Sequence, residues 1–491
     1  MNRVVTISGS SGVGKTTLAS VISLILGSEK SCKISGDDLH KWKRGDENWK
    51  KYTHLNPRAN NIDLGENQLQ NLKNNKSVLR KIYNHDTGDF EDEVEIFPKE
   101  WIIYEGLHAL HGEVNKLSEF RIFVETDDEL SSEWKIKRDV NKRGYTKQQV
   151  LDAIELRKND DLLYIAPQRE FANVIVKFEK TSNKIVMNYT CLENSCEDLM
   201  KNVRKFHDSM NEFVNLCKRL SLEPSLVQGR GGNVSVKFQD MIIVTSSGHF
   251  MADTNWEHGF CICDMNRKVN TKNEDDFLNS CRSSKISGDS NPSMELALHM
   301  KMQNRVVAHT HPVHLNSVLC AKESRDILKS IFPTLKYEYV EYVSPGLQLF
   351  LKLNSESKIV FLENHGLLVA GDSEKEVFEM TEFLDAKCKE WILEHSEIHI
   401  DVGIQKDEGY LFPDAAILPD EMKFTVRQIS HNIASTGLTP RFLTSDQLAF
   451  LFSMKAEKDR QYESYRANGW FRRSLCRERL QRPQAFNTNT S

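Results

Sequence analysis

The stretch Gly9-Ser10-Ser11-Gly12-Val13-Gly14-Lys15-Thr16-Thr17 fits the pattern G-x-x-x-x-G-K-[ST]. It stands between an apolar run over 4–7, which predicts a strand, and a pattern over 18–26 that predicts a helix. In such a loop, glycines let backbone N–H groups point at phosphate oxygens, the lysine adds positive charge, and the next hydroxyl holds Mg²⁺. The sequence therefore predicts a binding site for ATP phosphates and Mg²⁺. Its residues are Gly12, Gly14, Lys15, Thr16 and Thr17, with Thr16 on the magnesium ion.

The composition narrows the class of protein. A chain of 491 residues is too long for one hydrophobic core, and 39% hydrophobic residues suffice for two to four domains. The net charge of −5 gives no general attraction to nucleic acids or anionic membranes. No apolar run approaches the ~18 residues of a membrane span, and the ten cysteines lack a disulfide framework. We expect a cytoplasmic protein whose partners are small molecules, not nucleic acids or membranes.

Polar clusters follow two further apolar runs in the first part of the chain. One cluster, residues 35–40, contains Asp37, and the other begins at Glu105. Apolar runs alternate here with helical patterns, so we expect a mainly parallel sheet whose carboxyl edge gathers ligands. A carboxylate in that position holds Mg²⁺ or accepts a proton from a substrate hydroxyl. Each acid taken singly is also compatible with a turn or a helix cap.

The order of these segments resembles the phosphoribulokinase and uridine kinase family. Residues 83–88 resemble its substrate-side Tyr-x-His segment, and residues 137–146 resemble a bacterial phosphoribulokinase segment that closes over the phosphates. The family's fold is that of a P-loop NTPase. One departure is Asp38, which stands where such kinases often carry a small residue, so the acceptor stays open.

The resemblance also implies roles for individual residues. Asp37 is the expected catalytic base, Asp139 the expected assistant in catalysis, and Glu105 a ligand of Mg²⁺. The expected contacts to substrate are His40, Tyr83 and His85, and those to ATP phosphates include Arg138 and Arg143. Two arginines five residues apart suit a phosphate clamp, although a solvated helix face gives the same spacing.

A second domain is expected after a short, ordered join. A strand-like run over 173–176 closes the first sheet, the join contains another strand candidate over 184–189, and a helical pattern covers 196–220. We predict a kinase domain over 1–190, a second α/β domain over 198–475 and a disordered tail over 476–491. The Arg-rich stretch over 470–479 predicts a docking helix or a subunit contact.

Histidines give the strongest signal in the second part. His309 and His311 stand two apart in a strand-like run and therefore share one face. His365 lies beside a glycine in another strand-like segment, residues 361–369. Three histidines with an open position are the donor set of a catalytic zinc site, although hydrogen-bonded core histidines are the alternative.

These motifs resemble the class II aldolase/adducin superfamily. Residues 226–235 resemble its Gly-Asn-x-Ser loop, and residues 244–248 resemble the strand and turn that follow. The resemblance implies zinc on the three histidines, Glu295 as acid/base and Tyr342 as a proton donor. It implies a homo-oligomer, commonly a tetramer. The substrate phosphate is expected on Asn233, Ser247, Gly248 and Ser293, where Ser293-Met294 replaces the usual Ser-Ser pair.

Together these signals predict a bifunctional enzyme. One domain uses ATP and Mg²⁺ to phosphorylate a sugar or sugar acid, and the other carries out zinc-dependent aldol-type cleavage or formation on a sugar phosphate. Burial is expected to raise the pKa of Glu295 toward neutrality. Two alternatives remain open. In the first, the second domain is a decarboxylase of a 3-oxo acid phosphate or an epimerase. In the second, it is a metal-free, adducin-like binding module.

Overall fold

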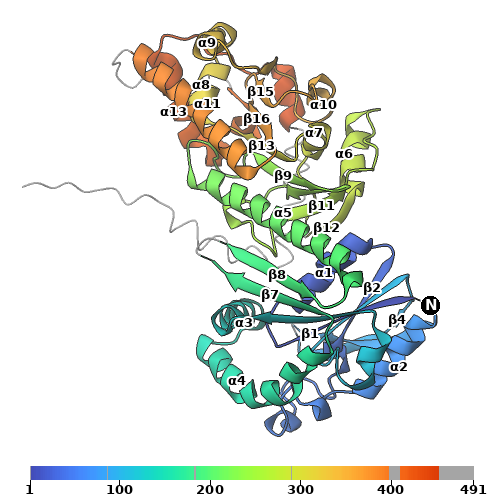
Figure 1. Ribbon diagram of the computed structural model, residues 1–491. Coiled ribbons are helices and arrows are strands. Elements are labelled where there is room, and N and C mark those ends of the chain that lie inside the picture. Colours follow the sequence, from blue (N-terminus) through green and yellow to red (C-terminus); the bar gives the residue numbers. More distant parts are fainter. Residues whose placement is uncertain are drawn as a thin grey trace, which may run out of the picture. The chain divides into compact units, whose positions relative to one another are not determined.

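The computed structural model describes residues 2–85, 87–181, 184–288, 290–396, 410–417 and 419–452 (Figure 1). The chain forms two compact units, Met1–Asn211 and Glu212–Ser491. Helix α5 (Glu197–Leu222) spans the boundary between them, where the sequence predicts a helix. The predicted tail over 476–491 and the Arg-rich stretch before it lie outside the described residues.

The first unit contains a six-stranded sheet in the order β2-β5-β1-β6-β7-β8. All neighbouring pairs are parallel except β7 with β8, which confirms the expected mainly parallel sheet. The strands are β1 (Arg3–Gly9), β2 (Ser31–Ser35), β5 (Trp101–Glu105), β6 (Phe120–Thr126), β7 (Val174–Lys180) and β8 (Ile185–Cys191). A separate hairpin consists of β3 (Val78–Asn84) and β4 (Asp89–Ile96).

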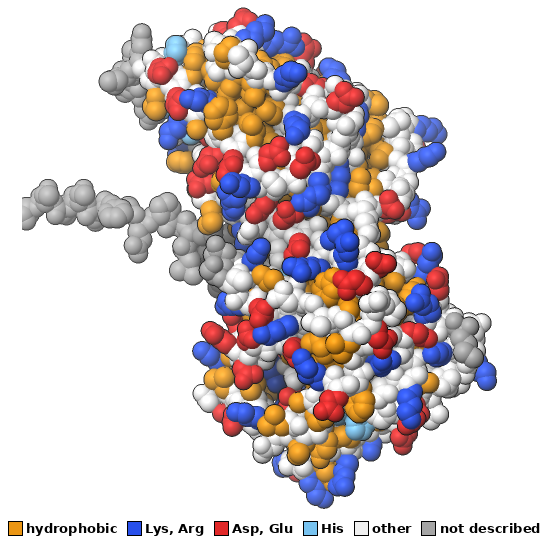
Figure 2. Space-filling model, in the orientation of Figure 1, with side chains coloured by type: hydrophobic (Ala, Val, Ile, Leu, Met, Phe, Trp, Pro, Cys, Tyr) orange, Lys and Arg blue, Asp and Glu red, His pale blue; other side chains and the backbone are white. Residues whose placement is uncertain are grey.

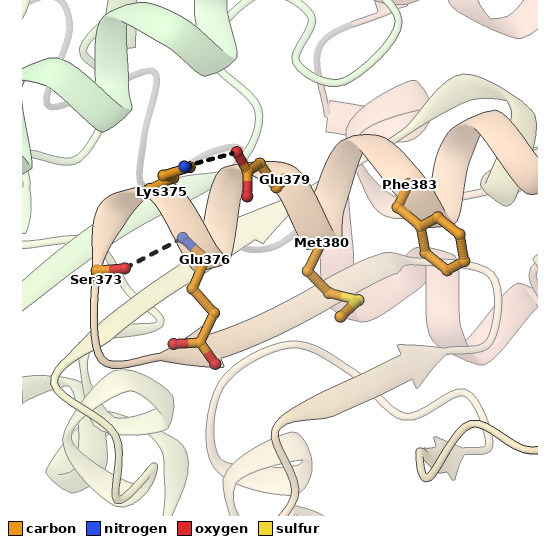
Figure 3. A pocket seen from close by; sticks show the side chains of 6 residues that line it. All are labelled: Ser373, Lys375, Glu376, Glu379, Met380 and Phe383. Atoms are coloured by element: carbon orange, nitrogen blue, oxygen red, sulfur yellow. Dashed lines mark hydrogen bonds and ion pairs between the residues drawn. The ribbon is translucent and has the colours of Figure 1, made fainter.

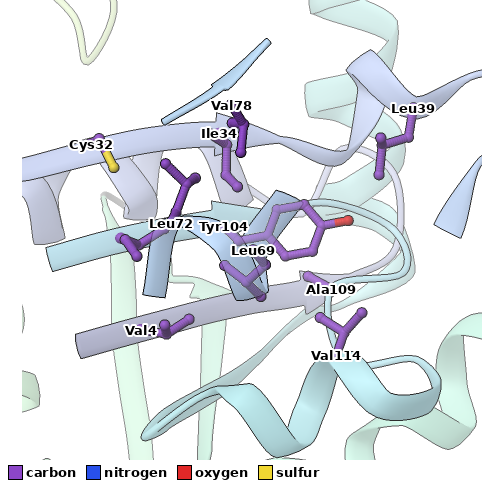
Figure 4. Close-up of a cluster of buried hydrophobic side chains, with 11 residues drawn as sticks. Val4, Cys32, Ile34, Leu39, Leu69, Leu72, Val78, Tyr104, Ala109 and Val114 are labelled. Atoms are coloured by element: carbon purple, nitrogen blue, oxygen red, sulfur yellow. The ribbon is translucent and has the colours of Figure 1, made fainter. Parts of the chain in front are cut away.

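Helices cover this sheet and carry several predicted site residues. They are α1 (Lys15–Leu26), α2 (Ile62–Lys73), α3 (Asp128–Arg143) and α4 (Lys147–Asp160), with a short 3-10 helix, η1, over Gly36–Leu39. Figure 4 shows one core cluster, in which Leu69 and Leu72 of α2 lie beside Tyr104 of β5. Each fully buried leucine contributes about 2 kcal/mol. This packing holds the strand that ends in Glu105.

The second unit is built on an eight-stranded sheet in the order β12-β11-β10-β9-β13-β16-β15-β14. Its pairs are antiparallel apart from β14 with β15. The strands are β9 (Asn233–Phe238), β10 (Met241–Thr245), β11 (Phe260–Asp264), β12 (Lys285–Gly288), β13 (Val306–Thr310), β14 (Glu338–Val340), β15 (Ile359–Leu362) and β16 (Gly366–Gly371). Both units therefore mix α and β structure, as expected from the sequence.

The helices of the second unit vary widely in length. They are α6 (Glu274–Ser283), α7 (Leu296–Lys301), α8 (Val313–Leu319), α9 (Ser324–Ile331), α10 (Leu347–Lys352), α11 (Glu374–His395), α12 (Pro413–Ile417) and α13 (Pro419–Ser435). None of the helices in the described ranges is long and apolar enough to cross a membrane. On the face that Figure 2 shows, basic and acidic side chains are interspersed.

Two predicted strands of the second unit differ in detail from the structure. β13 ends at Thr310, so His311 lies just beyond the strand. The predicted strand over 361–369 is two antiparallel strands, β15 and β16, with His365 in the turn between them. The turn forms because Asn364 adopts a φ of +50° and Gly366 fits close against the backbone of Thr310, where a Cβ would collide.

Gly9 fixes the start of the phosphate loop against the neighbouring strand. Its φ is +147°, and a Cβ there would collide with the carbonyl oxygen of Val124 in β6. We predict that Gly9→Ala lowers the free energy of unfolding by about 2–5 kcal/mol, from backbone strain and overpacking combined. Gly112 is the matched control, since its φ is +57° and nothing lies within 4 Å of a Cβ there.

Gly112→Ala should cost about 1 kcal/mol, from backbone strain alone. Urea unfolding of the full chain, followed by circular dichroism, measures both values. Equal losses in the two variants would contradict the close packing of Gly9 against β6.

Candidate functional sites

The phosphate loop joins β1 to α1 and has the geometry that the sequence predicts. Gly12 and Gly14 have φ values of +91° and +93°, which favour glycine. Thr16 and Thr17 are exposed in the first turn of α1. The Lys15 ammonium donates to the carbonyl oxygens of Gly9 at 2.9 Å and Ser10 at 2.7 Å. Burial lowers the pKa of Lys15, while the charges of Glu105 and Asp37 act in the opposite direction.

Glu105 lies beside the loop, as expected for a magnesium ligand. The parallel pairing of β5 with β1 and β2 brings this carboxylate close to two hydroxyls. Thr16 donates to its Oε1 atom at 3.2 Å, and Ser35 donates to the same atom at 3.3 Å. Burial and the charge of Asp37 raise the pKa of Glu105. A divalent cation would offset both effects, so the carboxylate and the Thr16 hydroxyl fit Mg²⁺.

Asp37 is held at the predicted position of the base, in η1 after β2. His85 Nε2 lies 3.1 Å from Asp37 Oδ2, and His40 Nε2 lies 4.0 Å from Oδ1. Burial would raise the pKa of this carboxyl, but the hydrogen bond from His85 and the nearby charges of His40, His85 and Lys15 lower it. The side chain is 35% exposed, so the carboxylate remains open to a hydroxyl group.

Aromatic rings pack around His40. Its ring centroid lies 5.3 Å from that of Tyr83, 5.7 Å from that of Trp49 and 5.2 Å from that of His54. His40 Nδ1 is 2.8 Å from Asn60 Oδ1, which fixes the orientation of the buried imidazole. The predicted substrate-side residues therefore lie together around Asp37.

The two arginines of α3 share one carboxylate. Arg138 Nε lies 2.8 Å from Asp139 Oδ1, and Arg143 Nη1 lies 3.3 Å from the same atom. Arg143 Nη2 also lies 3.0 Å from His85 Nδ1. In this geometry Asp139 holds both arginines, and Arg143 connects them to His85. The phosphate-clamp role of the arginines and the catalytic role of Asp139 stay predictions.

Asp38 is part of the frame beside this site. It lies 3.0 Å from Arg80 Nε, and its Oδ1 atom accepts the backbone N–H of Tyr83 at 2.8 Å. Both charged side chains are at least 92% buried, and Arg80 also donates to Gln68 and to the carbonyl of Ser35. The unusual acid at this position therefore ties β3 to η1, and it positions Tyr83.

Sequence reasoning missed several groups near the loop. Lys135 of α3 is buried against Gly12, where a Cβ would lie 3.2 Å from that of Lys135. Burial, with Arg157 and Arg138, lowers its pKa to about 7. Arg44 donates to the carbonyl of His85 at 2.6 Å. The only signal for Lys135 was its place one helical turn before Arg138, on the same face of α3.

Three histidines meet in the core of the second unit. Nε2 of His309 lies 2.9 Å from Nε2 of His311 and 3.2 Å from Nε2 of His365. All three side chains are buried, and their candidate ligand atoms lie within 4.8 Å of one another. Burial lowers the pKa of His309, and it lowers the pKa of His365 to about 3, whereas at His311 burial is outweighed by Asp414, which raises the pKa. Three buried imidazoles with converging nitrogens fit a zinc ion.

Glu295 lies beside these histidines, immediately before α7. Its carboxylate oxygens are 3.5 Å from His309 Nε2 and 3.5 Å from His365 Nε2. Asn233, the first residue of β9, donates to Glu295 Oε2 at 2.7 Å. The other side of the Asn233 amide contacts His299, whose Nδ1 lies 2.7 Å from Ser235 Oγ. Asn233 is therefore oriented from both ends, and it fixes Glu295 in turn.

The expected pKa of Glu295 was wrong in direction. Burial does favour the neutral acid, but His309, His365 and the hydrogen bond from Asn233 outweigh burial and lower the pKa to about 2. Glu295 is therefore a carboxylate at neutral pH. It is suited to accept a proton, and it becomes an acid only after it has done so.

The glycine-rich loops near Asn233 are partly occupied by internal hydrogen bonds. The N–H of Ser247 donates to the carbonyl of Asn291 at 2.8 Å, and the N–H of Gly231 donates to that of Gln228 at 3.0 Å. These two backbone N–H groups are therefore not free to bind the substrate phosphate that the resemblance places near Asn233, Ser247, Gly248 and Ser293. Ser293 is buried, and its Oγ accepts the N–H of Glu295 at 3.3 Å, while Gly248 is exposed with a φ of +74°.

Tyr342 lies in an apolar environment. Its ring packs against a cluster that contains Ala416, Leu443 and Leu451. Burial raises its pKa, and its hydroxyl has no hydrogen-bond partner among the described residues. The backbone N–H of Tyr342 donates to Glu363 at 3.2 Å. Its role as a proton donor stays a prediction.

A surface hollow lies apart from the predicted site residues, along the first turns of α11 (Figure 3). Lys375 and Glu379 form an ion pair of 3.7 Å at its edge, and Ser373 caps the helix by accepting the N–H of Glu376 at 3.2 Å. Met380 and Phe383 complete its lining. The Glu376 carboxylate is paired with Lys358 at 3.2 Å, outside the hollow, and we assign the hollow no ligand.

The two sites define a two-domain protein that combines a P-loop kinase with an aldolase-like domain carrying a buried histidine cluster. Comparison with known proteins agrees with this description. Residues 4–184 match the Phosphoribulokinase / Uridine kinase family, and residues 211–392 match the Class II Aldolase and Adducin N-terminal domain. The chain belongs to the first family through its N-terminal unit, and the match to the second domain lies almost entirely in its C-terminal unit.

Individual relatives cover parts of the chain. A phosphoribulokinase of Synechocystis sp. is 37% identical over 180 residues, which are 36% of this chain and 54% of the relative. A uridine kinase of Ligilactobacillus salivarius is 32% identical over 183 residues, which are 35% of this chain and 84% of the relative. The chain spans about half the length of the phosphoribulokinases that it matches.

Part of the chain is also similar to solved structures. The N-terminal class II aldolase domain of a conserved protein from Thermoplasma acidophilum is 22% identical, with a TM-score of 0.34. The match covers 37% of this chain and 93% of that domain.

The neighbouring acids Asp37 and Asp38 should respond differently to substitution. Asp38→Ala leaves the Arg80 guanidinium buried without its carboxylate, so we predict a loss of about 3–5 kcal/mol in the free energy of unfolding. Asp37→Asn changes a partly exposed carboxylate and should cost no more than about 1 kcal/mol. Thermal and urea unfolding measure both. A larger loss for Asp37→Asn than for Asp38→Ala would contradict these assignments.

Proposed function

We propose that the first unit transfers a phosphoryl group from ATP, with Mg²⁺, to a hydroxyl of a small polyhydroxy compound, most plausibly a sugar or a sugar acid. The observation that carries this is the placement of Asp37, a carboxylate with a lowered pKa, at the same sheet edge as Lys15 and Glu105. Mg²⁺ on Thr16 and Glu105 would neutralise phosphate charge.

Within this proposal, the residues around Asp37 have distinct tasks. Asp37 accepts the proton of the acceptor hydroxyl, while His85 and His40 hold its carboxylate in place. Lys15, Arg138 and Arg143 supply positive charge for the phosphates. The aromatic rings near His40 form the apolar side of the acceptor pocket. Most of the catalysis is then positioning and charge stabilisation.

For the second unit we propose aldol-type cleavage or formation on a sugar phosphate. The supporting observation is the buried group of three histidines with a fixed carboxylate 3.5 Å from two of them. Zinc on the histidines would polarise a substrate carbonyl or hydroxyl oxygen. Glu295 would take up and return the proton, and Asn233 would keep its carboxylate in the reactive orientation. The phosphate is proposed to lie near Asn233, Ser247, Gly248 and Ser293.

Decarboxylation of a 3-oxo acid phosphate and epimerisation use the same groups, because each requires a proton transfer beside a polarised carbonyl. Products distinguish the three: release of an aldehyde, release of CO₂, or an isomer of unchanged mass. The third possibility, a metal-free binding module, is disfavoured by the three converging imidazoles. Every cysteine in the described ranges is a free thiol, which supports a reducing compartment such as the cytoplasm. A homo-oligomer stays part of the proposal.

The kinase proposal is tested by incubating the protein with ATP and Mg²⁺ against a panel of pentoses, tetroses, heptoses and their acids. We expect one acceptor class to give ADP and a sugar phosphate, and Asp37→Asn to lower that rate about 10²–10⁴-fold. Lys15→Met should abolish it. An Asp37→Asn variant as active as wild type would remove Asp37 from the role of base.

Metal removal separates the two activities. After treatment with a zinc chelator and addition of Mg²⁺ alone, we expect phosphorylation to persist and the carbon–carbon lyase activity on preformed sugar phosphate to be lost. Glu295→Gln should lower the lyase rate about 10²–10⁴-fold while leaving phosphorylation unchanged. Lys15→Met is the reciprocal control, because it should retain lyase activity. Full lyase activity without zinc would contradict the proposal.

A further inference from the structure

A segment beyond the aldolase-like match reaches the histidine cluster. The match ends at residue 392, and α12 lies further along the chain. Asp414 of α12 has its Oδ2 atom 2.8 Å from Nδ1 of His311. The side chains of Asp414 and His311 are 17% and 6% exposed. The contact is therefore a largely buried pairing of a carboxylate with one of the three candidate zinc ligands.

The Asp414 carboxylate lies beside the outer nitrogen of His311. Its Nε2 faces the centre of the cluster, 2.9 Å from His309 Nε2, and its Nδ1, on the other side of the ring, faces Asp414. His309 is held in a related way, since its Nδ1 lies 3.0 Å from the carbonyl oxygen of Leu367. The partner of His309 is a neutral carbonyl, whereas that of His311 is a charged carboxylate. A carboxylate makes the imidazole a stronger electron donor at its other nitrogen.

The glycine-rich loop leaves room for this pair. A Cβ on Gly231 would lie 2.6 Å from Asp414 Oδ2 and 3.0 Å from His311 Nδ1. Any side chain at position 231 would therefore push the carboxylate or the imidazole out of place. The loop that begins the predicted phosphate site thus also sets the space for the Asp414 contact.

The segment that carries Asp414 is itself anchored. Phe412 is fully buried in a cluster with Ile429 and Ile433 of α13. The Asn364 side chain, next to the ligand His365, donates to the carbonyl of Leu411 at 2.7 Å and to that of Arg441 at 2.6 Å. The same segment therefore contacts two loops that carry ligands, and its burial fixes the position of Asp414.

We propose that Asp414 is a positioning residue for the zinc ligand His311, so that the C-terminal segment helps to build the metal site. The inference rests on the proposed zinc site of the second unit. It predicts a role in metal affinity for a residue that lies outside the aldolase-like match.

The test is a zinc titration of metal-free full-length protein in competition with a chromophoric chelator. Asp414→Asn keeps the size of the side chain and removes its charge, and we expect zinc affinity to fall about 10–100-fold. Asp414→Glu should recover part of this loss. Co²⁺ bound in place of zinc should show an altered absorption spectrum in Asp414→Asn. Gly231→Ala should also weaken zinc binding, by displacing the same pair.

Asp385→Asn is the matched control. Asp385 lies 2.8 Å from Nδ1 of His314, a histidine outside the cluster, so its loss should leave zinc affinity unchanged. If Asp414→Asn does not fold, Gly231→Ala decides the question. The role of Asp414 would be overturned if Asp414→Asn kept the zinc affinity and the cobalt spectrum of the wild type, or if Gly231→Ala kept the wild-type zinc affinity. Either result would leave the proposed zinc site itself standing. A wild-type protein that takes up no zinc would overturn both the proposed zinc site and the role of Asp414.

Discussion

Charged side chains that are removed from water need partners, and this requirement orders both units. Asp38 is paired with Arg80, and Glu295 lies among two histidines and the amide of Asn233. Removing one partner from such a group costs several kcal/mol, because the remaining charge stays desolvated. The backbone around each group is therefore constrained as well. In the first unit, the Asp38 pair ties the β3 hairpin to η1, and in the second, Asn233 ties β9 to the start of α7.

The same requirement separates exposed charged side chains from buried, paired ones. Asp37 and Asp38 are adjacent, yet one side chain is 35% exposed beside the phosphate loop and the other is 8% exposed against Arg80. The pKa of Lys15 is lowered by burial, while the charges of Glu105 and Asp37 act to raise it. Three charged groups of one site therefore differ in exposure and in the partners that surround them.

A large part of the fold was predictable because local patterns agree with it. The apolar runs before Gly9 and Glu105 are strands, and the parallel pairing of β1 with β5 follows from their alternation with helices. The loop glycines were identifiable because only glycine accepts the backbone conformation there. His309 and His311 were predictable as neighbours from their spacing. The turn at His365 was not, because it depends on the left-handed conformation of Asn364 and on close approach to Thr310.

By itself, the sequence determined the kinds of chemistry that this protein carries: a phosphate loop, acids after strands, and three histidines with a glutamate. Local motifs suffice to predict this chemistry, because each motif consists of residue types and spacings within one strand or loop. Only the tertiary structure decided how those groups are tuned. Three features show this: the lowered pKa of Glu295, the pairing of Asp38 with Arg80, and the contact of Asp414 with His311. Each joins residues that are between 14 and 103 positions apart in the sequence. Charge interactions depend on distance and burial, and packing alone sets both.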